Sequence, residues 1–106
     1  MKNQILSIIK NHTFQDRIKG KVIVKELKNR YDIIAEESQI RTGVNELRIE
    51  KYPIGSDGAG YFYALDDREL EHTIAQMTSR VDKMMQAVRG LNKCFEKKGQ
   101  LKMELK

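Results

Sequence analysis

One stretch of the chain places hydrogen-bonding side chains on a single face of a predicted helix. Over residues 36–51 (EESQIRTGVNELRIEK), Ile40, Val44 and Leu47 recur at spacings of four and three, which predicts the buried stripe of an amphipathic helix. The opposite face carries side chains that can hydrogen-bond to base edges: Ser38, Arg41, Thr42, Asn45 and Arg48, with Gln39 close to them. Arginine pairs with guanine and asparagine with adenine in the major groove of DNA, so this face is a candidate for base contacts; the alternative is a merely solvated surface.

Positive charge is the second feature that bears on chemistry. The 106 residues hold 20 Lys and Arg against 15 Asp and Glu, a net charge of +5, which favours an anionic partner such as nucleic acid. Residues 21–31 (KVIVKELKNRY) predict a second amphipathic helix, because Ile23, Leu27 and Tyr31 recur every four residues while basic side chains fall on the other side. Five lysines are candidates for contacts to DNA phosphates: Lys19, Lys21, Lys25, Lys28 and Lys51.

Other patterns predict the elements that would position these side chains. Residues 3–11 predict a short, largely buried helix, and residues 12–19 predict a loop that ends in a short extended piece. Gly43 lies at the edge of the apolar stripe, where it would let a neighbouring helix approach closely. A proline ends the helix, and Ile54 and the aromatic run YFY flank a glycine-rich turn, which predicts a β-hairpin with a loop longer than two residues.

The most regular pattern begins at Asp66. Apolar residues follow one another at alternating spacings of four and three, which predicts the heptad seam of a long helix over residues 66–99, with Gly99 as its stop. The seam residues are Leu70, Ile74, Met77, Val81, Met84, Val88, Leu91 and Phe95. We expect this seam to join a second subunit in a dimer; the alternative is that it packs on the rest of its own chain. Apolar residues beside the seam and a scarcity of flanking charges, with Arg80 the main one, favour a small bundle over a plain parallel zipper.

The segment over residues 41–65 (RTGVNELRIEKYPIGSDGAGYFYAL) resembles the recognition-helix-to-wing stretch of many phage and prophage winged helix-turn-helix proteins. Three pieces carry the resemblance, in the same order: Glu46-Leu47-Arg48 at the helix end, Tyr52-Pro53-Ile54-Gly55-Ser56 in a strand, and Gly60-Tyr61-Phe62-Tyr63-Ala64 after the glycine turn. With the helix from Lys21, the resemblance takes in residues 20–65. In that group the recognition helix often begins with Ser or Thr, whereas Glu36 or Glu37 stands here.

Together with these patterns, the resemblance implies an α+β, mainly α fold. It would comprise a winged helix-turn-helix domain over residues 1–65, a long helix for dimerisation or packing over 66–99, and a frayed basic tail over 100–106. The implied function is sequence-specific binding of double-stranded DNA, as a dimeric phage or prophage transcriptional regulator or a replication or excision accessory protein. The wing residues would lie along the DNA backbone or minor groove: Ser56, Gly58, Gly60 and Tyr61. The alternative is a module that binds and inhibits or recruits a host protein.

Other chemistry has little support in the sequence. The group Asp66, Asp67, Glu69 and His72 is better explained by the dipole of the helix that it begins than by a metal site. Cys94 is the single cysteine, no nucleophile–base pair is recognisable, and the GSDGAG segment lacks the Gly-Lys-Ser/Thr ending of a P-loop. We therefore expect no enzymatic activity, cofactor or metal. The apolar runs are too short to span a membrane and the N-terminus lacks a secretion signal, so a cytoplasmic location is expected.

Overall fold

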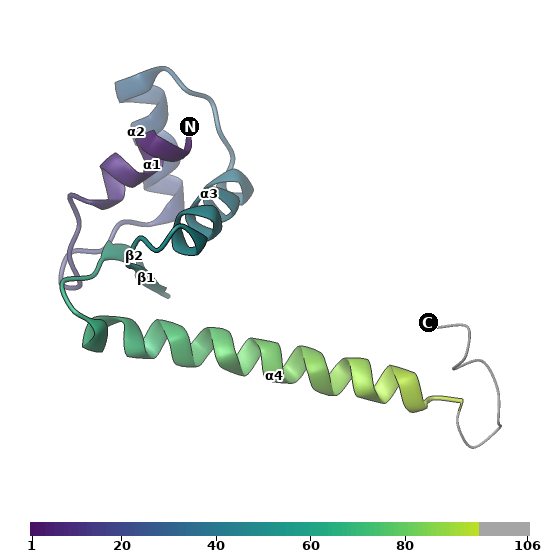
Figure 1. Ribbon diagram of the computed structural model, residues 1–106. Coiled ribbons are helices and arrows are strands. Elements are labelled where there is room, and N and C mark those ends of the chain that lie inside the picture. The colour runs from purple at the N-terminus through teal and green to yellow at the C-terminus, as the bar shows by residue number, and fades with distance from the viewer. Residues whose placement is uncertain (96–106) are drawn as a thin grey trace. The chain divides into compact units, whose positions relative to one another are not determined.

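The computed structural model of the chain describes residues 1–95. The chain divides into two units, residues 1–73 and the part from Ile74 onward. The elements follow in the order α1 (Lys2–Ile9), α2 (Gly20–Tyr31), α3 (Glu37–Ile49), β1 (Ile54–Asp57), β2 (Gly60–Tyr63), the 3₁₀ helix η1 (Asp67–Leu70) and α4 (Glu71–Lys93) (Figure 1). The fold is α+β and mainly helical, as the sequence predicts.

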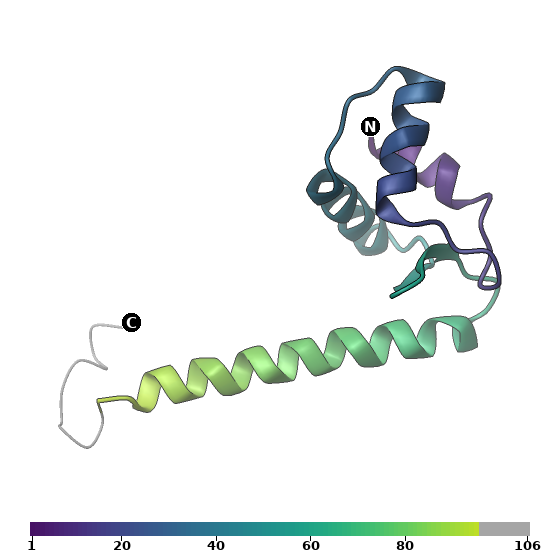
Figure 2. The same cartoon turned by 180° about the vertical axis from the view of Figure 1, so that it is seen from behind.

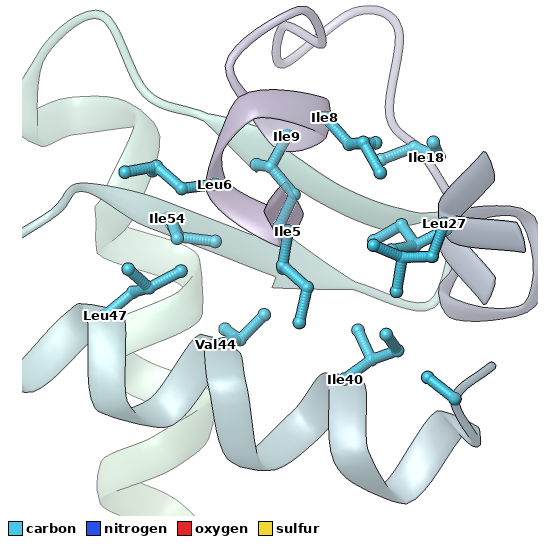
Figure 3. Close-up of a cluster of buried hydrophobic side chains, with 12 residues drawn as sticks. Ile5, Leu6, Ile8, Ile9, Ile18, Leu27, Ile40, Val44, Leu47 and Ile54 are labelled. Atoms are coloured by element: carbon cyan, nitrogen blue, oxygen red, sulfur yellow. The ribbon is translucent and has the colours of Figure 1, made fainter. Parts of the chain in front are cut away.

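The core of the first unit forms where one apolar stripe from each of α1, α2 and α3 meets the hairpin. Its central side chains are Ile5, Leu6, Ile8 and Ile9 of α1, Ile23 and Leu27 of α2, and Ile40, Val44 and Leu47 of α3. Figure 3 shows the α3 side chains pointing toward Ile5. Full burial of such a side chain contributes about 1.5–3 kcal/mol. The three helices predicted from apolar spacing are therefore confirmed, and the packing of their stripes holds them together.

Gly43 is a point of close approach between α3 and the Ile5 side chain of α1. A Cβ atom at this position would lie 2.8 Å from Cδ1 of Ile5, closer than carbon atoms normally pack. The predicted role of this glycine, to let a neighbouring helix approach, is confirmed. The missing side chain of Gly43 on α3 thus makes room for the side chain of Ile5 on α1. With this side of α3 packed against α1, the other face of α3 meets solvent.

The hairpin has a tighter turn than the sequence indicated. β1 and β2 pair antiparallel, with Ile54 opposite Tyr63 and Asp57 opposite Gly60, so only Gly58 and Ala59 connect them. The prediction of a loop longer than two residues was wrong, and Ser56 lies in β1. Asp57 shapes the turn, because its Oδ1 accepts the N–H of Ala59 at 2.8 Å.

A third extended piece lies beside β2. Ile18 and Tyr61 exchange both backbone hydrogen bonds, at 2.9 and 2.7 Å, so the segment before α2 runs along the hairpin (Figure 2). Gly60 makes this possible: its φ is +133°, and a Cβ there would lie 2.5 Å from the Ile18 carbonyl oxygen. The short extended piece predicted at the end of residues 12–19 is confirmed, and Ile18 is buried within the core.

The long helix differs from its prediction at both ends. Asp66 caps η1 by accepting the Glu69 N–H at 3.1 Å, and the α-helical part begins only at Glu71. α4 ends at Lys93, so Phe95 lies beyond it; the predicted stop at Gly99 and the tail over 100–106 lie outside the described residues. The helices within residues 1–95 are all too short or too polar to cross a membrane.

Candidate nucleic-acid interface

The outward face of α3 is polar and exposed. Ser38, Gln39, Arg41, Thr42 and Asn45 are all exposed, whereas the apolar stripe on the other side of the same helix is buried. The division arises because α3 is docked by its Ile40–Leu47 side alone. The sequence prediction of one buried and one exposed face therefore holds for this helix.

The members of this face differ in what holds them. Gln39 closes the start of α3, since its Oε1 accepts the Glu36 N–H at 2.9 Å, so the Glu36 that replaces a Ser or Thr still belongs to a capping arrangement. Thr42 donates its hydroxyl to the Ser38 carbonyl at 3.1 Å. Over residues 1–95, no hydrogen bond or ion pair engages the side chains of Arg41 and Asn45. These two, together with the exposed hydroxyl of Ser38, are therefore able to bond to an external group.

Arg48 has a different role from the one its position in the helix suggested. Its Nε donates to the Ile54 carbonyl at 2.8 Å and a terminal nitrogen donates to the Ser56 hydroxyl at 3.0 Å. The guanidinium is thus committed to β1 and is only partly exposed. We therefore assign Arg48 to positioning the hairpin against α3 and not to base contact.

Thr73 is a residue that sequence reasoning missed. It is 5% exposed, and its hydroxyl both donates to the Ser56 carbonyl and accepts the Ser56 N–H, each at 3.0 Å. Ser56 consequently joins α3, through Arg48, to the first turn of α4. No sequence signal distinguishes Thr73 from the exposed Thr78, because both are threonines beside the heptad seam.

Tyr61 connects the hairpin to the outward face of α3. Burial raises the pKa of its hydroxyl, while the nearby positive charges of Arg48 and Arg41 oppose that rise and Glu37 adds to it. Residues from β2 and from the start and middle of α3 therefore lie within electrostatic range of one another. Of the predicted wing residues, Ser56 contacts the predicted base-contacting face through Arg48, and Tyr61 lies within electrostatic range of Arg41 and Arg48.

A cleft of about 480 Å³ lies between the start of α2, the start of α3 and the hairpin. Its lining includes Lys19 and Lys21, Tyr61 and the predicted wing residues Gly58 and Gly60. Two carboxylates also line it, and they differ. Asp57 is paired with Arg17 at 3.3 Å, whereas Glu37 lies in the first turn of α3, where the helix dipole favours a negative charge.

The predicted phosphate-contacting lysines are placed unequally. Lys19, Lys21 and Lys25 are exposed, and no ion pair involves them in the part of the chain that the structure describes. Lys28 pairs with Asp32 at 3.3 Å, an exposed i,i+4 pair worth only a few tenths of a kcal/mol. Lys51 is exposed just after α3, in the left-handed region at φ 79°. Lys19 and Lys21 are the two that the fold brings to the cleft.

A second surface lies on α4. Its predicted seam residues Ile74, Val81 and Leu91 are 57%, 57% and 69% exposed, and Met84 and Val88 are 67% and 47% exposed. An apolar stripe of this kind on a helix is normally covered, whereas this one is exposed. Leu70 lies in η1, before this helix begins.

Two further observations bear on the kind of site. No three His, Cys, Asp or Glu side chains are grouped closely enough to hold a metal ion anywhere in residues 1–95, and Cys94 is a free, exposed cysteine. Comparison with known proteins adds no relative: no protein-family model, curated protein or solved structure matches this chain.

Proposed function

We propose that this protein is a winged helix-turn-helix protein that binds double-stranded DNA with sequence specificity, as a transcriptional regulator or an accessory of replication or excision. The single observation that carries the proposal is the outward face of α3. It is polar, it presents Arg41 and Asn45 without internal partners, and the first turn of α3 shares a cleft with the hairpin and the exposed Lys19 and Lys21.

The order and pairing of elements support this proposal. α2 and α3 are joined by residues 32–36, and the β1–β2 hairpin follows α3 directly, as in a helix-turn-helix followed by a wing. The bridge between Ile18 and Tyr61 gives the hairpin a third short strand. Arg48 and Thr73 both bond to Ser56, so the hairpin is braced from two sides and can present its turn in a fixed position.

The chemistry of α3 supports a role in reading bases. The major groove admits an α-helix, and there guanine offers two acceptors that match a guanidinium while adenine offers a donor and an acceptor that match an amide. We assign guanine contacts to Arg41 and adenine contacts to Asn45. Ser38 and Thr42, whose hydroxyls lie on the same face, are assigned to bases or to the sugar-phosphate backbone.

Contacts to phosphates fall to the lysines around the cleft. Lys19 and Lys21 line it and Lys25 is exposed one turn further along α2, so three unpaired ammonium groups lie along one side of the surface. Such contacts release counterions from DNA, and each one steepens the dependence of affinity on salt by about one unit of logarithmic slope. The net charge of +5 has the sign that this role needs.

The test is selection of bound duplexes from a randomised DNA pool at near-physiological salt. The chain should enrich a defined sequence, and Arg41→Ala should lose the preference at one or two base positions, at a cost of about 1–3 kcal/mol per lost contact. The matched control is Arg89→Ala, which removes another exposed arginine, from α4, and should leave the enriched sequence unchanged. If the pool yields no preferred sequence, or if Arg41→Ala selects the same one with the same affinity, the proposal is overturned.

A further inference from the structure

The seam of α4 has a regular distribution of side-chain shapes. In heptad notation, the a positions within the helix are Ile74, Val81 and Val88, and the d positions are Met77, Met84 and Leu91. All three a residues are branched at Cβ and none of the d residues is. β-Branched residues at a combined with Leu-like residues at d favour two parallel strands, because the side chains enter the facing helix at different angles at the two positions.

The exposed area of this seam matches what a stable dimer needs. The seam residues from Ile74 to Phe95 are 36% to 69% exposed. Exposures of this size leave roughly 100 Å² of each residue in water, so two such seams facing one another would remove on the order of 1,400 Å², within the range of stable protein interfaces. A single helix in water does not bury such a stripe, and few small partners present a matching one over three heptads.

We propose that α4 pairs in parallel and in register with α4 of a second copy of this chain. A second copy carries the same seam, so each a layer meets an a layer and each d layer a d layer, which is the condition for a closed two-fold interface. The flanking residues do not oppose this register. Arg80 at g would face Met85 at e of the other helix, where its aliphatic stem covers apolar surface, and no like charges oppose one another.

This inference revises the expectation of a small bundle. That expectation rested on the apolar residues that widen the face and on the shortage of charges beside the seam. Flanking charges set the choice and orientation of partners, whereas the shapes at a and d set the number of strands. Met85 and Ala87, which widen the apolar face, are the flanking residues that a two-stranded coil can cover only in part.

Parallel pairing has a consequence for DNA that rests on the proposed function. α4 is about 35 Å long at 1.5 Å per residue, and the chain enters it from the first unit. Parallel helices therefore bring both first units to the same end of the dimer, related by a two-fold axis, and the bound sequence would be an inverted repeat. Antiparallel helices would instead separate the two units by the length of α4.

Disulfide trapping tests the pairing without DNA. In a Cys94→Ser background, Leu91→Cys places one thiol at a d position, which faces its own copy only in a parallel, in-register pair. Mild oxidation should give at least about tenfold more covalent dimer than the matched control Ser79→Cys, whose thiol lies on the outer face, because disulfides need Cα atoms within about 7 Å. The proposal is overturned if Leu91→Cys gives no more dimer than the control.

Two further measurements complete the test. Mixing Leu91→Cys with Ile74→Cys chains carrying a different tag would trap an antiparallel pair, and a predominance of that mixed product overturns the parallel arrangement. Sedimentation equilibrium of the full chain without substitutions should give the mass of a dimer at micromolar concentration, and a monomer there overturns the pairing altogether. Since none of these measurements uses DNA, failure of the pairing can be told apart from failure of the proposed DNA binding.

Discussion

The apolar stripes of α3 and α4 have the same kind of spacing and opposite exposure. On α3, Ile40, Val44 and Leu47 recur at four and three residues and are at most 1% exposed. On α4, residues at the same spacings, such as Ile74 and Val81, are 57% exposed. The first stripe is covered by two other helices and a hairpin of its own chain, whereas the second is exposed, and we propose that a second copy covers it.

These two helices show what a periodic apolar pattern can and cannot predict. Apolar spacing fixes which face of a helix must be covered, because the driving force is the removal of apolar area from water. It does not fix what covers that face. In the first unit, Gly43 and the hairpin turn decide it by letting α1 and β1 approach α3. For α4, the shapes at the a and d positions point to an identical helix.

The largest expected difference between the two stripes is in how much a leucine-to-alanine substitution lowers the free energy of unfolding. Leu47→Ala removes a side chain that is 1% exposed and should lower the free energy of unfolding by about 2–5 kcal/mol, through lost burial and a cavity. Leu91→Ala removes one that is 69% exposed and should leave the unfolding of the first unit nearly unchanged. Urea titration followed by tyrosine fluorescence measures this, because all four tyrosines lie in residues 1–73. Equal losses of unfolding free energy in the two variants would show that both stripes contribute alike to the stability of the first unit.

A charge in the α4 seam should break the pairing and spare the first unit. Val81→Asp would bury a carboxylate at an a position, and a desolvated charge without a partner costs about 3 kcal/mol or more, equivalent to at least about a 100-fold rise in the dimer dissociation constant. Sedimentation equilibrium across a concentration series measures the constant. Ser79→Asp, on the outer face of the same helix, is the matched control. A dimer that survives Val81→Asp would place the interface elsewhere.

The bracing of the hairpin within the first unit should depend on Thr73. Thr73→Val keeps the shape of the side chain and removes both hydrogen bonds to Ser56, leaving a part-buried N–H and carbonyl without that partner. We expect the free energy of unfolding to fall by about 1–3 kcal/mol. Thr78→Val, at an exposed position on α4, should change it by less than about 0.5 kcal/mol. If the two valine variants unfold alike in urea, Thr73 does not brace the hairpin.

The smallest predicted effect concerns alkaline pH and Tyr61. Burial raises the pKa of this hydroxyl above its ordinary value of 10.0, so the folded chain keeps a proton that the unfolded chain loses. Stability is therefore fully present below pH 10 and declines as the pH rises above it, since the unfolded state then binds fewer protons. Tyr61→Phe should make the decline shallower in urea titrations above that pH. An unchanged slope would show that the hydroxyl is not shielded by the fold.

Much of the fold was predictable because its signals are local. Apolar spacing located α1, α2 and α3, and the change to a heptad pattern located α4. The errors fell where the hydrogen bonds of short turns decide the outcome. The hairpin turn is shorter than predicted because Asp57 pairs with Gly60, and Gly60 in turn is held against Ile18. The start of α4 is delayed because Asp66 caps a 3₁₀ turn first.

The candidate site was predictable in outline only. The sequence located the polar face of α3, but it could not separate side chains that are free from side chains that are engaged. Arg41 and Arg48 look equivalent in sequence, seven residues apart on one face. In the structure, Arg48 donates hydrogen bonds to the carbonyl of Ile54 and the hydroxyl of Ser56, whereas Arg41 has no such partner.

By itself the sequence determined the helices, their buried faces, the net positive charge and the heptad register, because each depends on residue type and spacing along one segment. Only the tertiary structure decided which arginine remains available and where Thr73 bonds. The physical reason is that hydrogen bonds and burial depend on groups brought together from distant parts of the chain. Ser56 illustrates it: its partners, Arg48 and Thr73, lie 8 and 17 residues away, and only folding makes them neighbours.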